Sequence, residues 1–206
     1  SVEGAMHTAE SRDPYGAALG AVRQFAEAGR FIPGEALVVT DLSAEVGLSP
    51  TPVREALACL AGEGLIERRR GRGYFYPQLT ASEVIDLFEL QLAFLHAALT
   101  LHPRGVGSLR KAVSSIDPLD GTQALFDAII DQSANRALMT AHHRVAHRLG
   151  PVLRAERALA EPSGEPVRRM IEAITEGQLP ELLHRLQTYH YKRSARATAY
   201  LKQSGR

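Results

Sequence analysis

The sequence predicts a mainly α protein in two parts, a small head that contains a basic hairpin and an all-helical bundle after it. Residues 36–76 read as two short helices, a glycine turn and a hairpin rich in arginine. After residue 78, apolar residues recur three and four apart, and no segment alternates convincingly as a strand would. The 206 residues, 45% of them hydrophobic, are enough for one or two domains with a buried core.

The N-terminal residues lead into the first helix of the head. Residues 1–13 lack apolar periodicity, so we expect a disordered tail. Apolar side chains at Leu19, Val22 and Phe25 predict a helix over residues 15–28. A Phe-Ile-Pro-Gly segment then stops this helix, because proline and glycine both interrupt helices. We expect the head to span residues 14–78.

Two short helices joined by a tight turn follow. Thr40 stands where an N-cap belongs, before a predicted helix over residues 41–46. Gly47 ends that helix, since glycine adopts a positive φ at no steric cost. Ser49 is the predicted N-cap of the next helix, and Pro50 occupies its first position, where a missing N–H is harmless. This order of elements predicts a helix-turn-helix.

The second of these helices carries the predicted reading surface. Val53, Leu57 and Leu60 face inward at helical spacing, which leaves Thr51 and Arg54 pointing outward. An outward arginine one turn into a helix can bond to guanine O6 and N7 or hold a phosphate. An exposed arginine alone is more often a solvated surface residue, and some winged helices bind protein. The prediction therefore depends on the neighbouring elements as well.

A basic hairpin completes the head. Residues 65–67 and 74–76 read as two short strands around Arg-Arg-Arg-Gly-Arg-Gly at residues 68–73. Arginines on a slim loop suit the phosphate backbone or a minor groove, so the head is predicted to be a winged helix-turn-helix. Residues 50–76 hold five arginines and three glutamates, a net charge of +2. Such a modest charge predicts weak binding by one head and a need to pair two.

The stretch SPTPVREAL, followed by EGLIERRRGRGYF, resembles the winged-helix head of GntR-family bacterial transcription regulators, and the resemblance covers residues 16–78. It implies that Thr40, Ser49, Thr51 and Arg54 contact an operator and that Gly71 and Arg72 lie on the wing. Pro50 departs from the pattern, since many members carry a base-reading arginine there. The predicted DNA-binding residues are Thr40, Ser49, Pro50, Thr51, Arg54, Arg70, Gly71 and Arg72.

A helical domain is predicted over residues 79–206. Pro77 breaks the last strand, and Thr80 and Glu83 form a capping box before a long apolar helix that we expect to be mostly buried. The apolar pattern continues in five further segments, which gives a bundle of about six helices. These segments are residues 106–114, 121–133, 136–158, 164–177 and 179–203.

This domain resembles, more loosely, the ligand-binding domain of the FadR-type GntR subfamily, through LFELQLAFLHAAL, ALFDAIIDQSANRALM and VRRMIEAITEGQLPELLHRLQTYH. In many members an aspartate and three histidines hold a metal that helps to bind a small carboxylate effector. Gln123, Asp127, Val167 and Tyr189 stand at those positions here, so we expect no metal and no cofactor. Gln91 and Leu95 stand where relatives often carry an arginine and a glutamate, which predicts a less acidic effector or none. The predicted effector-binding residues are Gln91, Gln123, Asp127 and Tyr189.

Two other groups of residues allow different interpretations. His143 and His147 lie four apart, a spacing that can ligate metal, and a metal enzyme that uses them with Asp127 is one alternative. Without an HExxH signature, surface histidines on an arginine-rich helix are the preferred interpretation. The segment 181–206 has a net charge of +5 and could contact phosphates, although basic residues are favoured near a helix C-terminus in any protein.

The function class follows from these patterns. The sequence has no GxSxG, P-loop or GxGxxG motif, so we expect no catalysis. No stretch approaches the ~20 apolar residues of a membrane span, so we expect a cytoplasmic protein without a membrane partner. The leading hypothesis is a transcription repressor that acts as a homodimer on a pseudo-palindromic double-stranded DNA operator and responds to a small-molecule effector. The alternative is a winged-helix DNA-binding protein whose helical domain is a ligand-free scaffold for dimerisation or protein interaction.

Overall fold

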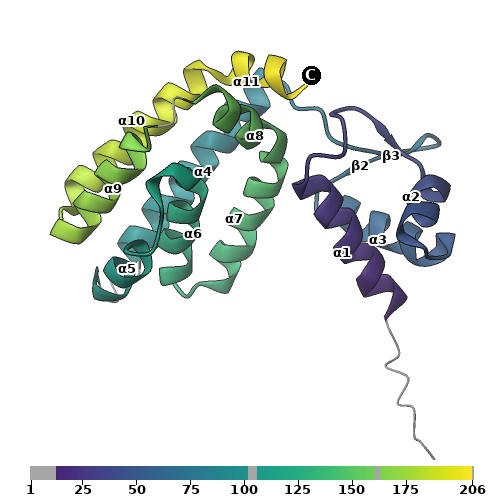
Figure 1. Ribbon diagram of the computed structural model, residues 1–206, viewed down its shortest axis with the longest axis horizontal. Helices are drawn as coiled ribbons and strands as arrows, with labels where there is room; N and C mark the ends of the chain where they lie inside the picture. The colour runs from purple at the N-terminus through teal and green to yellow at the C-terminus, as the bar shows by residue number, and fades with distance from the viewer. Residues whose placement is uncertain (1–12, 102–105, 161–162, 206) are drawn as a thin grey trace, which may run out of the picture. The chain divides into compact units, whose positions relative to one another are not determined.

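The computed structural model describes residues 13–101, 106–160 and 163–205, and within them the protein is mainly α-helical, as predicted (Figure 1). These residues divide into two compact units. The first unit, called the head below, contains the described residues up to Phe31 together with Glu35–Tyr76. The second, called the bundle, contains Ile32–Gly34 and the chain from Pro77 onward. The predicted tail lies outside the described residues except for Asp13, whose carboxylate accepts the Tyr15 N–H at 3.1 Å and caps the first helix.

The head packs three helices with a small antiparallel sheet in which the strand order is β1-β3-β2. A single core of apolar side chains from the three helices, from β1 and β3 and from adjoining segments holds it together, including Val22, Leu37, Leu57 and Ile66. The elements are α1 (Pro14–Glu27), β1 (Ala36–Leu37), α2 (Val39–Val46), α3 (Pro50–Gly62), β2 (Glu67–Arg69) and β3 (Gly73–Phe75).

The start of α2 corrects one prediction. The N-cap of α2 is Val38, because the Leu42 N–H already donates to the Val38 carbonyl at 3.0 Å. Thr40 therefore lies inside the first turn and does not cap it. Ser49 is the N-cap of α3 as predicted, although its side chain makes no capping hydrogen bond.

The strands also differ from the predicted ones. β2 begins at Glu67, because the Leu65 N–H bonds back to the Leu60 carbonyl at 2.9 Å and Ile66 turns into the core. β1 was not predicted, since two residues are too few to show an alternating pattern. It pairs Ala36 with Phe75 and so ties the start of the helix-turn-helix to the hairpin.

The turn between α2 and α3 allows a direct test of whether position 47 requires glycine. Gly47 has φ +73°, and no atom lies within 4 Å of the place where its Cβ would be. We therefore expect Gly47→Ala to lower the free energy of unfolding by about 1–2 kcal/mol through backbone strain alone. Gly20→Ala is the matched control, because Gly20 is exposed within α1 and alanine should stabilise a helix there by about 0.5–1 kcal/mol. Urea unfolding of both variants measures this, and effects of the same sign would contradict the argument.

In its described residues the bundle has eight α-helices and one 3₁₀ turn, and no strand. Two predicted helices are each split in two. The segment 136–158 breaks before Pro151, whose ring would clash with the preceding turn and which lacks an N–H. The segment 179–203 breaks at Arg196, with φ −103° and ψ 3°. The elements are α4 (Ala81–Leu101), α5 (Val106–Val113), η1 (Pro118–Asp120), α6 (Thr122–Gln132), α7 (Arg136–Arg148), α8 (Gly150–Leu159), α9 (Glu165–Glu176), α10 (Leu179–Ala195) and α11 (Ala197–Ser204).

Helix α4 is the central helix of the bundle and contacts α6, α7, α10 and α11. Its 21 residues are long and apolar enough to span a membrane by length and composition, contrary to the expectation that no stretch approaches this. The helix nevertheless packs inside the bundle. Leu95 and Leu99 belong to one core, and Val84 and Phe88 belong to a second. A core helix of a folded domain meets the same criteria of length and hydropathy.

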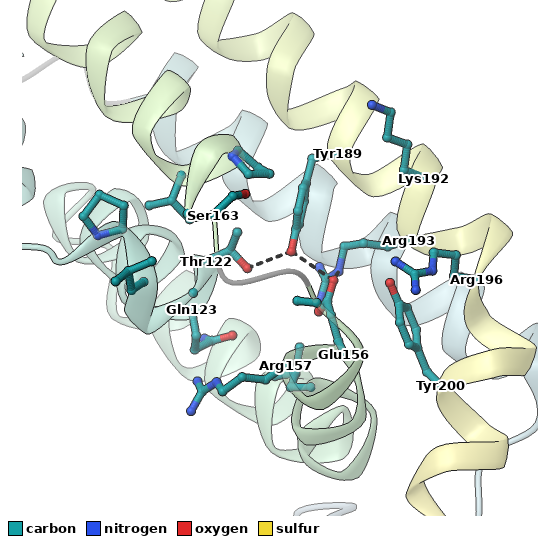
Figure 2. Close-up of a pocket in the computed structure, with 18 residues that line it drawn as sticks. Thr122, Gln123, Glu156, Arg157, Ser163, Tyr189, Lys192, Arg193, Arg196 and Tyr200 are labelled. Carbon is teal, nitrogen blue, oxygen red and sulfur yellow. Dashed lines mark hydrogen bonds and ion pairs between the residues drawn. The ribbon is translucent and has the colours of Figure 1, made fainter.

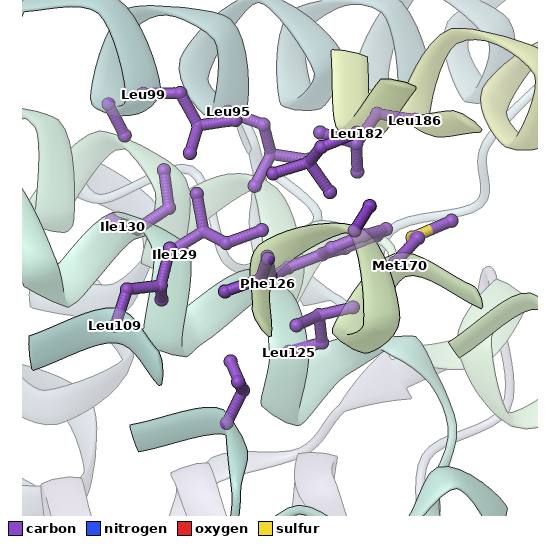
Figure 3. Packing of buried hydrophobic residues seen from close by; sticks show 14 of the residues in the cluster. Leu95, Leu99, Leu109, Leu125, Phe126, Ile129, Ile130, Met170, Leu182 and Leu186 are labelled. Carbon is purple, nitrogen blue, oxygen red and sulfur yellow. The ribbon is translucent and has the colours of Figure 1, made fainter. Parts of the chain in front are cut away.

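The larger of the two cores is built around Phe126 of α6 (Figure 3). Side chains of α4, α5, α9 and α10 surround this ring, and Leu95, Leu125 and Leu186 are fully buried. The second core joins α4 to α7, α8 and α11. The two cores together fix the helices whose side chains line the cavity described below.

Candidate functional site

The exposed N-terminal end of α3 is the first candidate site. Ser49, Pro50, Thr51 and Arg54 are all exposed, while Val53, on the opposite side of the helix, is fully buried in the head core. Among the described residues no acidic side chain forms an ion pair with Arg54. Its guanidinium is thus held on a fixed helix and is free to meet a ligand.

The structure brings Arg54 and the hairpin together. They line one hollow of about 550 Å³, and its described lining holds four arginines and no acidic residue. One of the four, Arg69, donates from Nη2 to the Glu67 carboxylate at 2.9 Å. The hairpin turns because Gly71 adopts φ +73° and the Arg72 N–H donates to the Arg69 carbonyl at 3.0 Å. This surface, called the reading surface below, is lined by Arg54, Arg68, Arg69, Arg70, Gly71, Gly73 and Tyr74.

Some predicted residues lie outside that hollow. Thr40, Ser49, Pro50 and Thr51 are exposed but do not line it. Arg72 does not line it either, and its guanidinium lies 5.9 Å from the centre of the Phe75 ring. Conversely, Arg68, Arg69, Gly73 and Tyr74 line the hollow and are not in the predicted set. They form two facing pairs in the ladder of β2 and β3, Arg68 with Tyr74 and Arg69 with Gly73.

A cavity of about 530 Å³ in the bundle is the second candidate site (Figure 2). Its walls come from η1, α6, α8, α9, α10 and α11. Leu153, Val167 and Pro118 give it apolar surface. Its volume lies within the roughly 300–1,000 Å³ of ordinary small-molecule sites.

A buried arginine forms one side of the cavity. Arg193 of α10 is 2% exposed, and its Nε and Nη2 each donate to a carboxylate oxygen of Glu156 at 2.9 Å. Its Nη1 donates to Gln91 Oε1 at 2.9 Å, and the guanidinium lies 4.0 Å from the centre of the Phe88 ring. The network joins α4, α8 and α10. The possibility that segment 181–206 contacts phosphates is therefore wrong for Arg193, which is buried.

The structure brings only some of the predicted effector-binding residues to the cavity. Gln123 and Tyr189 line the cavity, whereas Gln91 is fully buried behind Arg193 and does not line it. Asp127 also lies outside the lining, where its Oδ1 accepts the Gln123 amide at 2.7 Å. Glu156 is not among the predicted site residues. The sequence contains one signal for it, because Glu156 is the sole acidic residue between positions 132 and 160.

Protonation states in this region follow from burial. Burial raises the pKa of Tyr189 well above its usual value, and its hydroxyl donates to Glu156 Oε1 at 2.9 Å and lies 3.2 Å from the Thr122 hydroxyl. Burial, followed by the nearby Arg193 cation, lowers the pKa of His190 to about 4. At neutral pH Tyr189 is thus a hydrogen-bond donor and His190 is uncharged.

The residues at the metal-ligand positions of the resembled subfamily do not fit a metal ion. Val167 has no donor atom, and the Tyr189 hydroxyl stays protonated. In the parts of the chain that the structure describes, no three His, Cys, Asp or Glu side chains are grouped to hold a metal.

The alternative metal site is not assembled either. His143 and His147 contact each other, with 2.8 Å between their Nε2 atoms. Asp127 instead lies 2.9 Å from Nε2 of the buried His142. The three residues that a metal enzyme would use here are therefore not brought to one place.

Known proteins similar to this chain agree with the arrangement of the head. The family model described as bacterial regulatory proteins, gntR family, matches residues 14–75. The Nta operon transcriptional regulator of Aminobacter aminovorans is 42% identical over 65 residues, which is 32% of this chain and 30% of that protein. An uncharacterised HTH-type transcriptional regulator in an unstable DNA locus of Streptomyces ambofaciens is 31% identical over 165 residues, covering 72% of this chain and 70% of that protein.

The fold of both units recurs in a solved structure. The crystal structure of a putative GntR transcriptional regulator from Rhodococcus sp. RHA1 has a TM-score of 0.71 to this chain and 17% sequence identity. The match covers 90% of this chain and 97% of that one. At this identity the likeness concerns the fold.

Proposed function

Because the chain belongs to the GntR family of bacterial transcription regulators, which bind DNA, we propose that it is a sequence-specific repressor acting on a pseudo-palindromic operator. The observation that supports this best is the reading surface, where Arg54 of α3 and the wing arginines line one hollow without an acidic residue. In this arrangement α3 enters the major groove and Arg54 bonds to a base or phosphate. Arg70 and Gly71 follow the backbone or the minor groove.

The other predicted contacts complete this interface. The hydroxyls of Ser49 and Thr51 lie exposed at the start of α3, where they can bond to phosphate oxygens. Thr40 on α2 and Arg72 on the wing extend the same set of contacts, although they lie outside the hollow. Pro50 has no donor, so it contacts the DNA by shape only. Base preference therefore depends chiefly on Arg54.

Two heads are needed for tight binding. The few cations of one reading surface neutralise few phosphates, which gives weak binding at physiological salt. We propose a homodimer whose two heads contact two half-sites, so that the symmetry of the operator mirrors that of the protein. The bundle supplies the dimer contacts, and the protein acts in the cytoplasm without catalysing a reaction.

The cavity of the bundle is proposed as the effector site. Gln123 and Tyr189 line it directly, while Asp127 orients Gln123 and Gln91 supports Arg193 from behind. An effector that binds the non-operator conformation more tightly releases the DNA, and such coupling is typically about 1–3 kcal/mol. The second candidate, a ligand-free scaffold, is disfavoured by a cavity of about 530 Å³ with polar and apolar walls.

Selection of bound sequences from random duplex DNA at low ionic strength tests this proposal. We expect an inverted repeat to be enriched, and we expect affinity for it to fall steeply as salt is raised. Arg70→Gln, which removes one exposed wing cation, should bind the same repeat with a shallower salt dependence, by about one phosphate per head. No enrichment at low salt would refute the repressor proposal, and enrichment of a single half-site would refute the dimer.

A further inference from the structure

Helix α7 carries a pair of histidines on its outer side. His143 and His147 are four positions apart, so they lie one turn apart on the same side of the helix. Val145, which points to the other side, is buried in the core that joins α4, α7, α8 and α11. His143 is exposed and His147 is half-buried. The two imidazoles are therefore presented by a helix whose position is fixed by packing.

The two rings are close enough to bind one ion together. Their Nε2 atoms are 2.8 Å apart, and their ring centres are 4.2 Å apart. With metal–nitrogen distances of ~2.0–2.1 Å, two nitrogens at this separation subtend an angle of roughly 85–90° at the ion. This angle suits the square-planar or tetragonal coordination of Cu²⁺ and Ni²⁺. It is smaller than the ~109° between ligands of a tetrahedral Zn²⁺ site.

An ion can replace the contact between the two rings without a change in their charge. Between neutral imidazoles this contact is a hydrogen bond, in which one Nε2 carries a proton and the other Nε2 accepts it. Metal binding requires both Nε2 lone pairs, so the donor ring must change to the tautomer that is protonated at Nδ1. The Nε2 proton leaves to water and another proton from water binds Nδ1 of the same ring. Both Nε2 atoms then coordinate the ion.

This pair is separate from the metal-ligand positions of the resembled subfamily, which lie here on α6, α9 and α10. In the described parts of the chain no third His, Cys, Asp or Glu is grouped with the two histidines, so water completes the coordination of the ion. The neighbouring Arg144 and Arg148 on α7 oppose a cation and lower its affinity, although water and salt screen exposed charges such as that of Arg144.

We propose that His143 and His147 form a two-ligand surface site for a divalent transition-metal ion, and that Cu²⁺ binds there most tightly. Imidazole is a suitable ligand for copper, nickel and zinc. The affinity of one site for these ions rises from Ni²⁺ to Cu²⁺ and falls again at Zn²⁺, and the narrow angle between the two nitrogens favours the same choice. The site depends on neither DNA nor an effector, so it stands apart from the proposed function.

Calorimetry on the full chain without an affinity tag, at neutral pH, tests the choice of ion. The probes are CuCl₂, NiCl₂ and ZnCl₂, each titrated alone. We expect Cu²⁺ to bind more tightly than Ni²⁺ or Zn²⁺, and pulsed EPR of the Cu²⁺ form should show two imidazole ligands. Tighter binding of Zn²⁺ than of Cu²⁺, fewer than two imidazole ligands, or no saturable binding of Cu²⁺ would overturn the proposal.

Single variants test the assigned residues. His143→Ala and His147→Ala should each weaken Cu²⁺ binding at least about tenfold, because one ring alone cannot chelate the ion. The double variant should lose little more than either single one, since each change already removes the shared site. Alanine is the best helix former, so α7 should stay folded, and urea unfolding without metal checks this.

The matched control is His184→Ala, which removes an exposed histidine of α10. We expect this variant to bind Cu²⁺ as the wild type does. An equal loss of affinity in the control would show that surface histidines bind the ion without selectivity and would refute the site. Unchanged affinity in either His143→Ala or His147→Ala would refute it as well.

Discussion

Replacing Arg54 with alanine is expected to lower affinity for the selected operator by about 2–6 kcal/mol in a dimer, because each head loses a contact worth about 1–3 kcal/mol. Arg54 is exposed and lines the reading surface beside Arg68 and Arg70. Its removal should leave the fold intact, since the buried side of α3 is untouched. Fluorescence anisotropy with the selected duplex at fixed salt measures the loss, and urea unfolding checks the stability.

A matched substitution separates a specific contact from a general loss of charge. Arg144 is likewise an exposed arginine on a helix, but it belongs to α7 in the bundle. Arg144→Ala should change the affinity by less than a factor of about two, because Arg144 is not among the proposed DNA contacts and exposed charges are largely screened at physiological salt. If Arg54→Ala behaved like Arg144→Ala, the assignment of α3 as the reading helix would be wrong.

The largest effect on stability is expected from Glu156→Ala. The side chains of Arg193 and Glu156 are 2% and 14% exposed, so the variant would leave a buried guanidinium without its counter-charge. Breaking a buried ion pair by removing one partner typically costs about 3–5 kcal/mol. The free energy of unfolding, measured in urea, should fall by this amount.

Two further variants give this prediction its controls. Glu165→Ala removes the acid of an exposed group with Arg168 and Arg169 and should lower the free energy of unfolding far less, because water and salt screen exposed ion pairs. Glu156→Leu combined with Arg193→Met should be more stable than Glu156→Ala, because replacing both charges leaves no unpaired charge in the interior. A loss for Glu156→Ala as small as that for Glu165→Ala would show that the buried network does not stabilise the bundle.

The head was largely predictable because its signals are local. Gly47, the Ser49-Pro50 helix start and the arginine-rich loop each act within a few residues, and the structure has the predicted helices and hairpin at these places. The errors in the head are of two kinds. Two bounds are misplaced, since α2 starts after Val38 and not after Thr40, and β2 starts at Glu67 and not at residue 65. One element is missed, because β1 is too short to leave a pattern.

The cavity was less predictable because its partners are distant in sequence. The Glu156 carboxylate and the Arg193 guanidinium are 37 positions apart, and only packing brings them together. The break before Pro151 was visible in the sequence, since proline is disfavoured in a helix interior. The break at Arg196 was not, because neither proline nor glycine occurs there.

These two breaks give the cavity an unusual position within the bundle. Because the chain bends before Pro151 and at Arg196, α8 and α11 pack against each other and against the Val84 half of α4, apart from the core around Phe126. Gln123 and Val167 on one wall are carried by helices of the Phe126 core, whereas Leu153 and Tyr200 on the other wall are carried by α8 and α11. A molecule bound there would contact helices of both hydrophobic cores. Its binding free energy would thus change the stability of the packing between the two cores.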